Sequence, residues 1–427
     1  MYSLGIDIGT TKIAATLVDL TTGDKRPCGS APTPTLTPSF DGEHIQDAHD
    51  IIHTVKRLID ENMSDEVCAI GLSGQMHGIV YMDEKGQAVS PLYTWQDMRG
   101  KVQAEALGIR AGYGHATHAY NDEHGLIPAA ACGYATIADA ACASLCRLSA
   151  PVLHASNAAS MGCFSIDKNR FIAPLKEKYP YEIESGYRIA GEYRGVPVAV
   201  GIGDNQASFL GSGCRIGEML INIGTGSQVS VLSDRCTVHP SIEARPGFDG
   251  YYLLVGAALC GGRAYAVLHD FFCDVVEMAT GERPRSLYEA MAVYQTNAGD
   301  ASLRFDNAFC GTRQNPAKRG SIQGISVDNF TPKQFCVGLL EGTINELADL
   351  AFAMDVPMRA LVGAGNALRK NPLLQHLCEK RFGIPLYLPD HCEEAAVGAA
   401  LFAAISANLF TDAHAAVALL RRSTKPN

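Results

Sequence analysis

The sequence predicts an α/β protein made of two related halves. A chain of 427 residues corresponds to two or three domains. With 47% hydrophobic and 19% charged residues, it is neither disordered nor a charged coiled coil. The two halves are indicated by a β-hairpin with a Gly-Thr turn that occurs twice, once at the start and once in mid-chain. Segments with helical periodicity separate the β-rich runs.

The two hairpins are similar in construction. A strand from Tyr2 ends at the turn Gly9-Thr10-Thr11-Lys12, and a second strand follows. In mid-chain, a strand from Glu218 ends at the turn Gly224-Thr225-Gly226-Ser227, and again a strand follows. Gly224 lies 215 residues after Gly9, which is about half of the chain. A repeat at this spacing predicts a duplicated architecture.

Four segments have the apolar spacing or the composition of helices. They are Asp47–Asn62, Thr136–Leu148, Thr331–Phe352 and the Ala-rich Glu393–Ile405. Pro332 stands near the start of the third, where proline favours a first helical turn. The β-rich run Val196–Val200 ends one half, so the expected domains are residues 1–202 and 203–427.

Charge and composition argue against several partners. With 35 Lys+Arg against 45 Asp+Glu, the net charge is −10, which disfavours nucleic acid. The uncharged run Ala395–Phe410 is too short to span a membrane, which takes about 20 residues. Asp7 interrupts the first apolar stretch, so no secretory signal is expected. We expect a cytoplasmic protein with its 14 cysteines reduced. We expect no metal at His115, His118 and His124.

Each Gly-Thr turn is a candidate anion site. Adjacent backbone N–H groups in a tight turn form a concavity that binds phosphates, and Thr or Ser hydroxyls add donors. Asp7 precedes the first turn, where an acid can hold a metal-bound water. The alternative is an ordinary hairpin built from turn-favouring residues.

Two further turns follow β-rich runs. In Gly201-Ile-Gly203-Asp204-Asn205, the carboxylate of Asp204 can accept a proton from a bound hydroxyl, or it can simply cap the helix that follows. In Gly363-Ala364-Gly365-Asn366, with Asn371 opening a helix, the glycines allow a base or ribose to approach. The alternative for this second segment is a tight strand-to-helix turn.

A third pair of segments is suited to a polyhydroxylated ligand. Gly74-Gln75-Met76-His77-Gly78 is followed by Trp95-Gln96-Asp97-Met98-Arg99, which sets an aromatic face beside amide, carboxylate and guanidinium groups. The alternatives are a surface ion pair for Asp97 and Arg99 and a buried, hydrogen-bonded His77.

Together these segments resemble the FGGY family of carbohydrate kinases, in the actin/Hsp70/hexokinase superfamily. The resemblance spans nearly the whole chain, in the family's order, and includes Arg319–Ile322, Leu340–Gly342 and Glu394–Gly398. It implies an α/β fold of two duplicated ribonuclease-H-like domains around a central cleft, the first on the sugar side and the second binding nucleotide. It also implies ATP and Mg²⁺ as cofactors and a small-molecule sugar as the second substrate.

The resemblance implies a role for each candidate residue. Asp204 would be the general base, and Asp7 would hold Mg²⁺ through water, with Asp204 as a second contact of the metal. The residues implied to bind phosphate or nucleotide are Thr10, Thr11, Lys12, Gly224, Thr225, Gly226, Ser227, Gly363, Ala364, Gly365, Asn366 and Asn371. The residues implied to bind the sugar are Gln75, Met76, His77, Trp95, Gln96, Asp97, Arg99 and Asn205.

The stretch before the domain boundary is most similar to family members that act on sedoheptulose. The segments that carry this similarity include Tyr93–Asp97 and Ser156–Gly162. The expected substrate is therefore a ketose, with xylulose or another polyol as the alternative. Ala119–Ala131 lacks the Lys and Trp usual in the family, and Tyr265 stands where many members have Trp, so these departures bear on substrate identity. A homodimer is a candidate assembly.

Other classes of protein fit the sequence less well. A filament or chaperone subunit of the superfamily has no need of Asp204 or of a sugar pocket. An ATPase activator of radical enzymes needs a compact cysteine cluster, and a non-catalytic sugar sensor would have lost the base.

Overall fold

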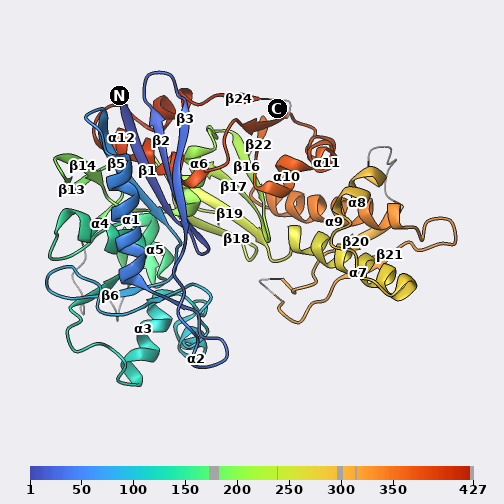
Figure 1. Ribbon diagram of the computed structural model, residues 1–427, viewed down its shortest axis with the longest axis horizontal. Coiled ribbons are helices and arrows are strands. Elements are labelled where there is room, and N and C mark those ends of the chain that lie inside the picture. The colour runs from blue at the N-terminus through green and yellow to red at the C-terminus, as the bar shows by residue number, and fades with distance from the viewer. Residues whose placement is uncertain (173–181, 238, 296–301, 313–314, 424–427) are drawn as a thin grey trace. The chain divides into compact units, whose positions relative to one another are not determined.

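The computed structural model describes residues 1–172, 182–237, 239–295, 302–312 and 315–423 (Figure 1). The chain forms two compact units, each assembled from segments that are distant in the sequence. Unit 1 comprises Met1–Cys214, Arg245–Tyr251 and Glu393–Arg421. Unit 2 comprises Arg215–Ala244, Tyr252–Cys392 and Arg422–Asn427.

This division differs from the expected domains 1–202 and 203–427. Unit 1 continues to Cys214, so it includes Asp204, and it also contains two later segments of the chain. Glu393–Arg421, which was expected in the second domain, belongs to unit 1. Packing between residues so far apart in the sequence leaves no local pattern. The sequence therefore did not predict that Glu393–Arg421 belongs to unit 1.

Unit 1 is organised around a mixed sheet. Among the described residues it has seven strands, in the order β13-β14-β5-β1-β2-β3 with β15 beside β5. These strands are β1 (Tyr2–Ile8), β2 (Lys12–Asp19), β3 (Lys25–Pro32), β5 (Val67–Gly74), β13 (Ile189–Tyr193), β14 (Val196–Ala199) and β15 (Ile202–Gly203). β1 pairs antiparallel with β2 and parallel with β5, so β1 and β5 end at the same edge of the sheet.

Helices and short strand pairs complete unit 1. The helices are α1 (Ala48–Asn62), α2 (Lys101–Leu107), α3 (Gly114–Glu123), α4 (Ile137–Cys146), α5 (Ala155–Ser160), α6 (Asp204–Gly211), α12 (Glu394–Ser406) and α13 (Ala413–Ala418). The strand pairs are β4 (Ile45–Gln46) with β7 (Leu92–Tyr93), β6 (Val80–Met82) with β8 (Gly133–Ala135), β9 (Val152–His154) with β12 (Glu182–Glu184), and β10 (Phe164–Ser165) with β11 (Arg170–Phe171).

Unit 2 contains a second mixed sheet, in the order β18-β19-β17-β16-β22-β23-β24. Its strands are β16 (Glu218–Ile223), β17 (Ser227–Ser233), β18 (Ile242–Pro246), β19 (Tyr252–Ala258), β22 (Ala360–Ala364), β23 (Leu386–Pro389) and β24 (Arg422–Ser423). The other elements are α7 (Gly262–Thr280), α8 (Tyr288–Gln295), β20 (Arg304–Asp306), β21 (Ser321–Gln323), α9 (Pro332–Phe352), α10 (Asn366–Lys370) and α11 (Pro372–Phe382).

The two sheets confirm the predicted duplication. In each sheet the first strand pairs antiparallel with the second and parallel with a later strand: β1 with β2 and β5, and β16 with β17 and β22. β3 and β19 then extend the sheets in the same way, each antiparallel to the second strand. Ile8 and Ile223 end the two first strands, so both Gly-Thr turns occupy the same place in their sheets.

The predicted helices form where their end signals place them. Asp47 caps α1 by accepting a hydrogen bond from Asp50 N, and Thr331 caps α9 in the same way with Pro332 in its first turn. α4 begins after Thr136, and α12 begins one residue after the expected Glu393. Local signals therefore fix these ends well.

α12 covers the face of the unit 1 sheet opposite α1 and α4. It packs so closely that a Cβ added at Gly5, Gly71 or Gly211 would overlap its backbone. A Cβ on its own Gly398 would overlap the backbone of α6 at Ala207. The small residues of α12 thus allow backbone-to-backbone contact that larger side chains would prevent.

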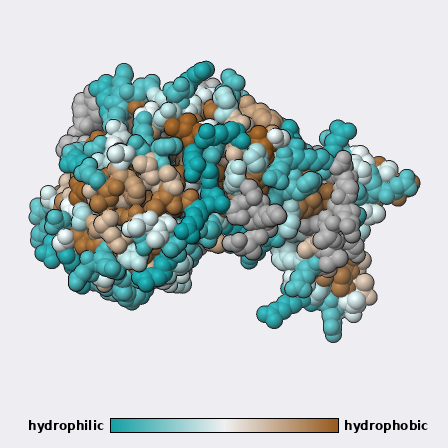
Figure 2. Space-filling model, turned by 90° about the horizontal axis from the view of Figure 1, so that it is seen from above, coloured by the Kyte–Doolittle hydropathy of each residue, from teal (hydrophilic) through white to brown (hydrophobic). Residues whose placement is uncertain are grey.

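The molecular surface has mixed hydropathy. Figure 2 shows hydrophilic and hydrophobic residues interspersed over the face seen from above. Among the helices of the described residues, none is both long and apolar enough to cross a bilayer.

Candidate active site

Asp7 and Asp204 form the centre of the predicted site in unit 1. Asp7 is the last residue but one of β1, and Ser73 Oγ donates to its Oδ1 at 2.8 Å. Loss of hydration and the nearby charge of Asp204 raise the pKa of Asp7 to about 7. Loss of hydration also raises the pKa of Asp204, against a hydrogen bond from Asn205 and the positive charge of Arg245. Two half-buried carboxyl groups therefore lie close enough to influence each other's ionisation.

Asp204 is the first residue of α6 and does not cap it. The N-cap position is Gly203, and no side chain makes a cap hydrogen bond there. Helix capping as the role of Asp204 is thus wrong, because its side chain lies within the first turn rather than before it. Its Oδ1 accepts a hydrogen bond from Asn205 Nδ2 at 2.9 Å.

α5 holds the turn that presents Asp204. Ser156 Oγ accepts a hydrogen bond from Gly203 N at 3.0 Å, and Asn157 Nδ2 donates to Gly201 O at 3.0 Å. Ser160 Oγ accepts from His77 N at 3.0 Å. One short helix therefore fixes both the Asp204 turn and the His77 turn, a supporting role that the sequence did not reveal.

Gln75, Met76 and His77 follow β5. Gln75 and Met76 are buried, and Gln75 N donates to Ile8 O at the end of β1. His77 has a positive φ of 77°, its ring stacks on Tyr113 with centroids 4.3 Å apart, and its Nδ1 lies 2.7 Å from Ser160 O. The ring of His77 is therefore held by a stacking partner and a hydrogen bond.

Trp95 lies against the first Gly-Thr turn. Its Nε1 donates to Thr10 Oγ1 at 3.0 Å, and Gln46 Nε2 donates to Thr10 O at 2.7 Å. Trp95 is 46% exposed, so part of the side chain is open to a ligand. Thr11 is exposed, and so is Lys12, whose Nζ lies 2.7 Å from Glu393 Oε1. The structure thus brings a predicted sugar residue and a predicted phosphate turn together.

Asp97 and Arg99 form a buried ion pair, so the alternative of a surface ion pair is wrong. Arg99 Nε lies 2.8 Å from Asp97 Oδ1, and Arg99 Nη2 lies 2.8 Å from Glu43 Oε1. The guanidinium also stacks over Tyr93 at 4.2 Å. Asp97 further accepts hydrogen bonds from the backbone N–H groups of His44 and Arg99. Gln96, in contrast, is exposed.

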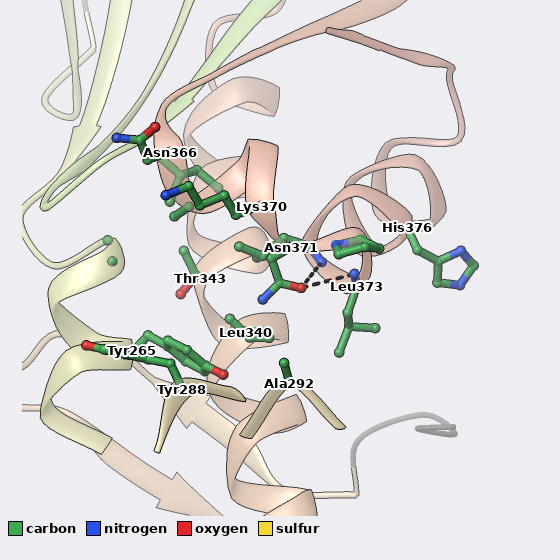
Figure 3. Close-up of a pocket in the computed structure, with 16 residues that line it drawn as sticks. Tyr265, Tyr288, Ala292, Leu340, Thr343, Asn366, Lys370, Asn371, Leu373 and His376 are labelled. Atoms are coloured by element: carbon green, nitrogen blue, oxygen red, sulfur yellow. Dashed lines mark hydrogen bonds between the residues drawn. The ribbon is translucent and has the colours of Figure 1, made fainter. Parts of the chain in front are cut away.

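Unit 2 contains a cavity of about 870 Å³ beside its own Gly-Thr turn (Figure 3). Its walls include Gly261 and Gly262 at the start of α7, Tyr265, Tyr288, and the segment from Asn366 to Leu374. Asn371 lines it and also caps α11, with Oδ1 accepting from Leu373 N and Leu374 N, as Figure 3 shows. This volume is within the range of ligand pockets.

Of the residues predicted to bind nucleotide, some line this cavity and others are buried away from it. Asn366 and Asn371 line the cavity, whereas Gly363 and Ala364 are buried in β22. A Cβ on Gly363 would meet Leu368 and Leu388 at 2.7 Å, so this glycine serves packing.

Gly365, the glycine after β22, allows the chain to turn from this strand into α10. Gly365 has a positive φ of 85° and forms a tight strand-to-helix turn. The alternative of a tight strand-to-helix turn thus explains Gly365, and packing explains Gly363, without a ligand.

The second Gly-Thr turn is exposed at Gly224, Thr225 and Gly226. Its carbonyl groups accept from the start of α7: Gly262 N donates to Gly224 O at 2.8 Å, and Arg263 N donates to Thr225 O at 3.1 Å. Ser227 is buried, and its Oγ is without a hydrogen-bond partner in the described part of the chain. The turn is therefore anchored through its oxygens.

The histidines near the middle of unit 1 have structural contacts. His115 is buried and lies against Tyr134 and Phe171, and burial lowers its pKa to about 3. His118 Nδ1 lies 2.9 Å from Tyr81 Oη, and His124 is exposed. No group of three or more potential metal ligands occurs in the residues that the structure describes.

Two charged residues near Asp7 and Asp204 were missed. Glu393, whose charge also raises the pKa of Asp7, comes from the far end of the chain. Arg245 is the last residue but one of β18. Neither carries a local motif that could have indicated its place.

The duplicated units, with a carboxylate pair in one and a ligand-sized cavity in the other, define a two-domain phosphotransferase. Residues 2–120 match the N-terminal domain of the FGGY family of carbohydrate kinases, and residues 219–407 match its C-terminal domain. The chain belongs to this family, and its activity is ATP-dependent phosphorylation of a sugar.

Several proteins resemble the whole chain. Mouse sedoheptulokinase is 27% identical over 466 residues, covering 93% of this chain and 96% of the relative. Gluconokinase of Bacillus subtilis is 23% identical, covering 94% and 86%.

Among solved structures, gluconate kinase from Lactobacillus acidophilus has a TM-score of 0.87 at 18% identity, covering 99% of this chain and 92% of that one. Glycerol kinase of Plasmodium falciparum with ADP has a TM-score of 0.80 at 17% identity, covering 99% and 92%. These structures confirm the fold.

Proposed function

We propose that this kinase transfers the γ-phosphoryl group of ATP to a terminal hydroxyl of a ketose, with sedoheptulose as the first candidate. The observation that carries the proposal is the Asp204 carboxylate, which lies close to Asp7, accepts a hydrogen bond from Asn205 and is not used to cap α6. The choice of sugar is supported by the mouse and human sedoheptulokinases, at 27% and 26% identity over 93% of the chain.

In this proposal Asp204 is the general base. It accepts the proton of the sugar hydroxyl as that oxygen attacks the γ-phosphorus of ATP. A raised pKa is suited to this role, since it makes the carboxylate a stronger base than an ordinary aspartate. Met76, His77, Trp95 and Asn205 would line the sugar site, with Gln75, Gln96, Asp97 and Arg99 behind or around them.

The residues around Asp7 fit a divalent cation. Asp7, Asp204 and Glu393 repel one another when ionised, and this repulsion contributes to the raised pKa of Asp7. A cation would relieve it, and carboxylate oxygens are the ligands that Mg²⁺ prefers. We therefore propose that Asp7 holds Mg²⁺ through water, with Asp204 as a second contact; when bound, the ion neutralises phosphate charge. Lys12, which is paired with Glu393, would contribute a further positive charge to the phosphates.

We place the nucleotide in the cavity of unit 2. Tyr265 and Tyr288 offer ring faces to a base, and Asn366, Lys370 and Asn371 offer polar groups (Figure 3). Thr10 and Thr11 in unit 1 and Gly224 to Ser227 in unit 2 are proposed to bind the phosphates.

The alternative substrate is D-xylulose or another polyol. Xylulose kinase of Streptomyces coelicolor is 23% identical over 99% of the chain, so the sugar is not decided by similarity alone. The cytoplasmic location and the homodimer stay predictions; light scattering of the purified protein would measure the second.

The experiment is ADP release from the purified protein with ATP and Mg²⁺, across sedoheptulose, D-xylulose, L-ribulose, D-gluconate, glycerol and D-fructose. A selective response to sedoheptulose supports the proposal. Preference for another compound keeps the mechanism and changes the substrate. If no sugar stimulates ADP release, the proposed ketose kinase activity is wrong.

A further inference from the structure

The segment Arg245–Tyr251 lies in the second half of the sequence, between two segments of unit 2, but it belongs to unit 1. Gln206 Nε2, from α6, donates to Pro246 O at 2.8 Å. Phe248 is buried in the core that contains α12. Asp249 accepts hydrogen bonds from Tyr187 Oη at 2.9 Å and from Ala413 N at 3.2 Å. Contacts with several elements therefore fix the position of this segment.

The fixed segment delivers the side chain of Arg245 to the sugar side of unit 1. Arg245 is 5% exposed, and its Nη1 lies 3.5 Å from Met76 Sδ. The same sulfur lies 3.6 Å from Asn205 Nδ2. The positive charge of Arg245 also opposes the rise in the pKa of Asp204. The guanidinium thus shares its surroundings with three proposed active-site residues.

Met76 Sδ is a weak hydrogen-bond acceptor for one of the donors of Arg245. A guanidinium presents five donors in a plane, and the hydroxyl oxygens of a sugar are suitable acceptors. The position of Arg245 beside Met76 and Asn205 would place those donors near the sugar rather than near the base of ATP.

We propose that Arg245 is a further sugar-binding residue, whose guanidinium donates hydrogen bonds to oxygens of the acceptor sugar near the reacting hydroxyl. This inference rests on the proposed function of Asp204 and its neighbours. It assigns to the end of β18 a part in substrate specificity.

The test is steady-state kinetics of Arg245→Gln and Arg245→Lys, with sedoheptulose, or the best sugar of the panel, as the varied substrate. Arg57→Gln is the matched control, because Arg57 is an exposed arginine of unit 1 paired with Glu61. We expect Arg245→Gln to raise the KM for the sugar roughly 10- to 100-fold, with the KM for ATP unchanged. Lysine should recover part of the loss, since it keeps the charge and loses the planar fork.

The outcomes distinguish a failure of the proposed kinase activity from a failure of the proposed role of Arg245. If the wild-type enzyme shows no sugar-dependent ADP release, the proposed function fails. If it responds to sugar but folded Arg245→Gln keeps the wild-type KM for the sugar, only the role of Arg245 is overturned. Equal increases in the KM for sugar and for ATP would also overturn it.

Should Arg245→Gln not fold, Arg245→Lys decides. The sugar alone should then raise the melting temperature of this variant less than that of the wild type. An equal rise would overturn the role.

Discussion

At the scale of single residues, the carboxyl groups of unit 1 differ in the hydrogen-bond donors and charges that surround them. Asp97 accepts four hydrogen bonds, one from His44 N and three from N–H groups of Arg99. Asp7 and Asp204 lie close to each other, and both have raised pKa values. The environment, rather than the residue type, decides which carboxylate is available as a base.

The first prediction concerns Asp204→Asn. Removing the base should lower kcat by about 100-fold or more, while ATP and sugar still bind, because the amide keeps the size of the side chain. Steady-state kinetics and calorimetric titration with each substrate check this. Loss of binding to the same extent as turnover would mean that Asp204 is structural.

The second prediction concerns Asp139, a buried residue of α4. Burial raises the pKa of Asp139 to about 7, against hydrogen bonds from Thr136 and Asn157. The unfolded chain, with an ordinary pKa, then binds fewer protons than the folded protein between about pH 4 and pH 7. The stability of the wild type should therefore fall as pH rises through this interval, by up to about 1.4 kcal/mol per pH unit from this group.

Asp139→Asn should remove that contribution, since asparagine does not titrate. Urea unfolding at pH 5 and pH 8 compares the two proteins. A wild-type decline that the variant reproduces in full would assign the pH dependence to other groups.

At the scale of elements, the contact between α12 and the unit 1 sheet depends on missing side chains. A Cβ on Gly71 would overlap Ala399 O and lie 3.1 Å from the Cβ of Ala403. Gly71→Ala should therefore lower the free energy of unfolding by about 1–3 kcal/mol or more. Gly186→Ala is the control, because its Cβ would meet only the end of the Glu184 side chain, at 3.4 Å. Equal denaturation midpoints for the two variants would contradict the close contact.

The ion pair of Arg99 joins the loop after β7 to the one before β4. Its removal in Arg99→Ala leaves Asp97 and Glu43 buried without their guanidinium, which costs about 3–5 kcal/mol. Arg57→Ala, at an exposed pair, should cost less than about 1 kcal/mol. Urea unfolding measures both. A weaker affinity for sugar with unchanged stability would instead place Arg99 in direct contact with the substrate.

Element positions were predictable wherever a local signal exists. Asp47 and Thr331 cap the helices that they precede, and both Gly-Thr turns end the first strand of a sheet. The Ala-rich composition of α12 indicated close packing but not its neighbours, because almost every residue of the helix is apolar and no single face is marked for burial. Arg245 and Glu393 reach the site by tertiary packing alone, so no spacing could reveal them.

At the scale of the whole molecule, the chain passes between the two units five times. Unit 1 is therefore complete only when its last segment, Glu393–Arg421, has been added. A chain ending at Cys392 should lose the stability of unit 1, since α12 covers one face of its sheet. Limited proteolysis of the truncated protein, followed by mass spectrometry of the fragments, checks this. A unit 1 as resistant as in the full chain would show that α12 is dispensable.

The hydrogen bond between Trp95 and Thr10 has a practical consequence. Trp95 is the sole tryptophan of the chain, and its indole touches the turn proposed to bind phosphate. Its fluorescence therefore comes from one known place, with no label required. A sugar or an anion that reaches the turn changes the polarity around the ring and hence the colour and intensity of its emission. Each ligand can thus be titrated alone, which yields its affinity before any phosphoryl group moves.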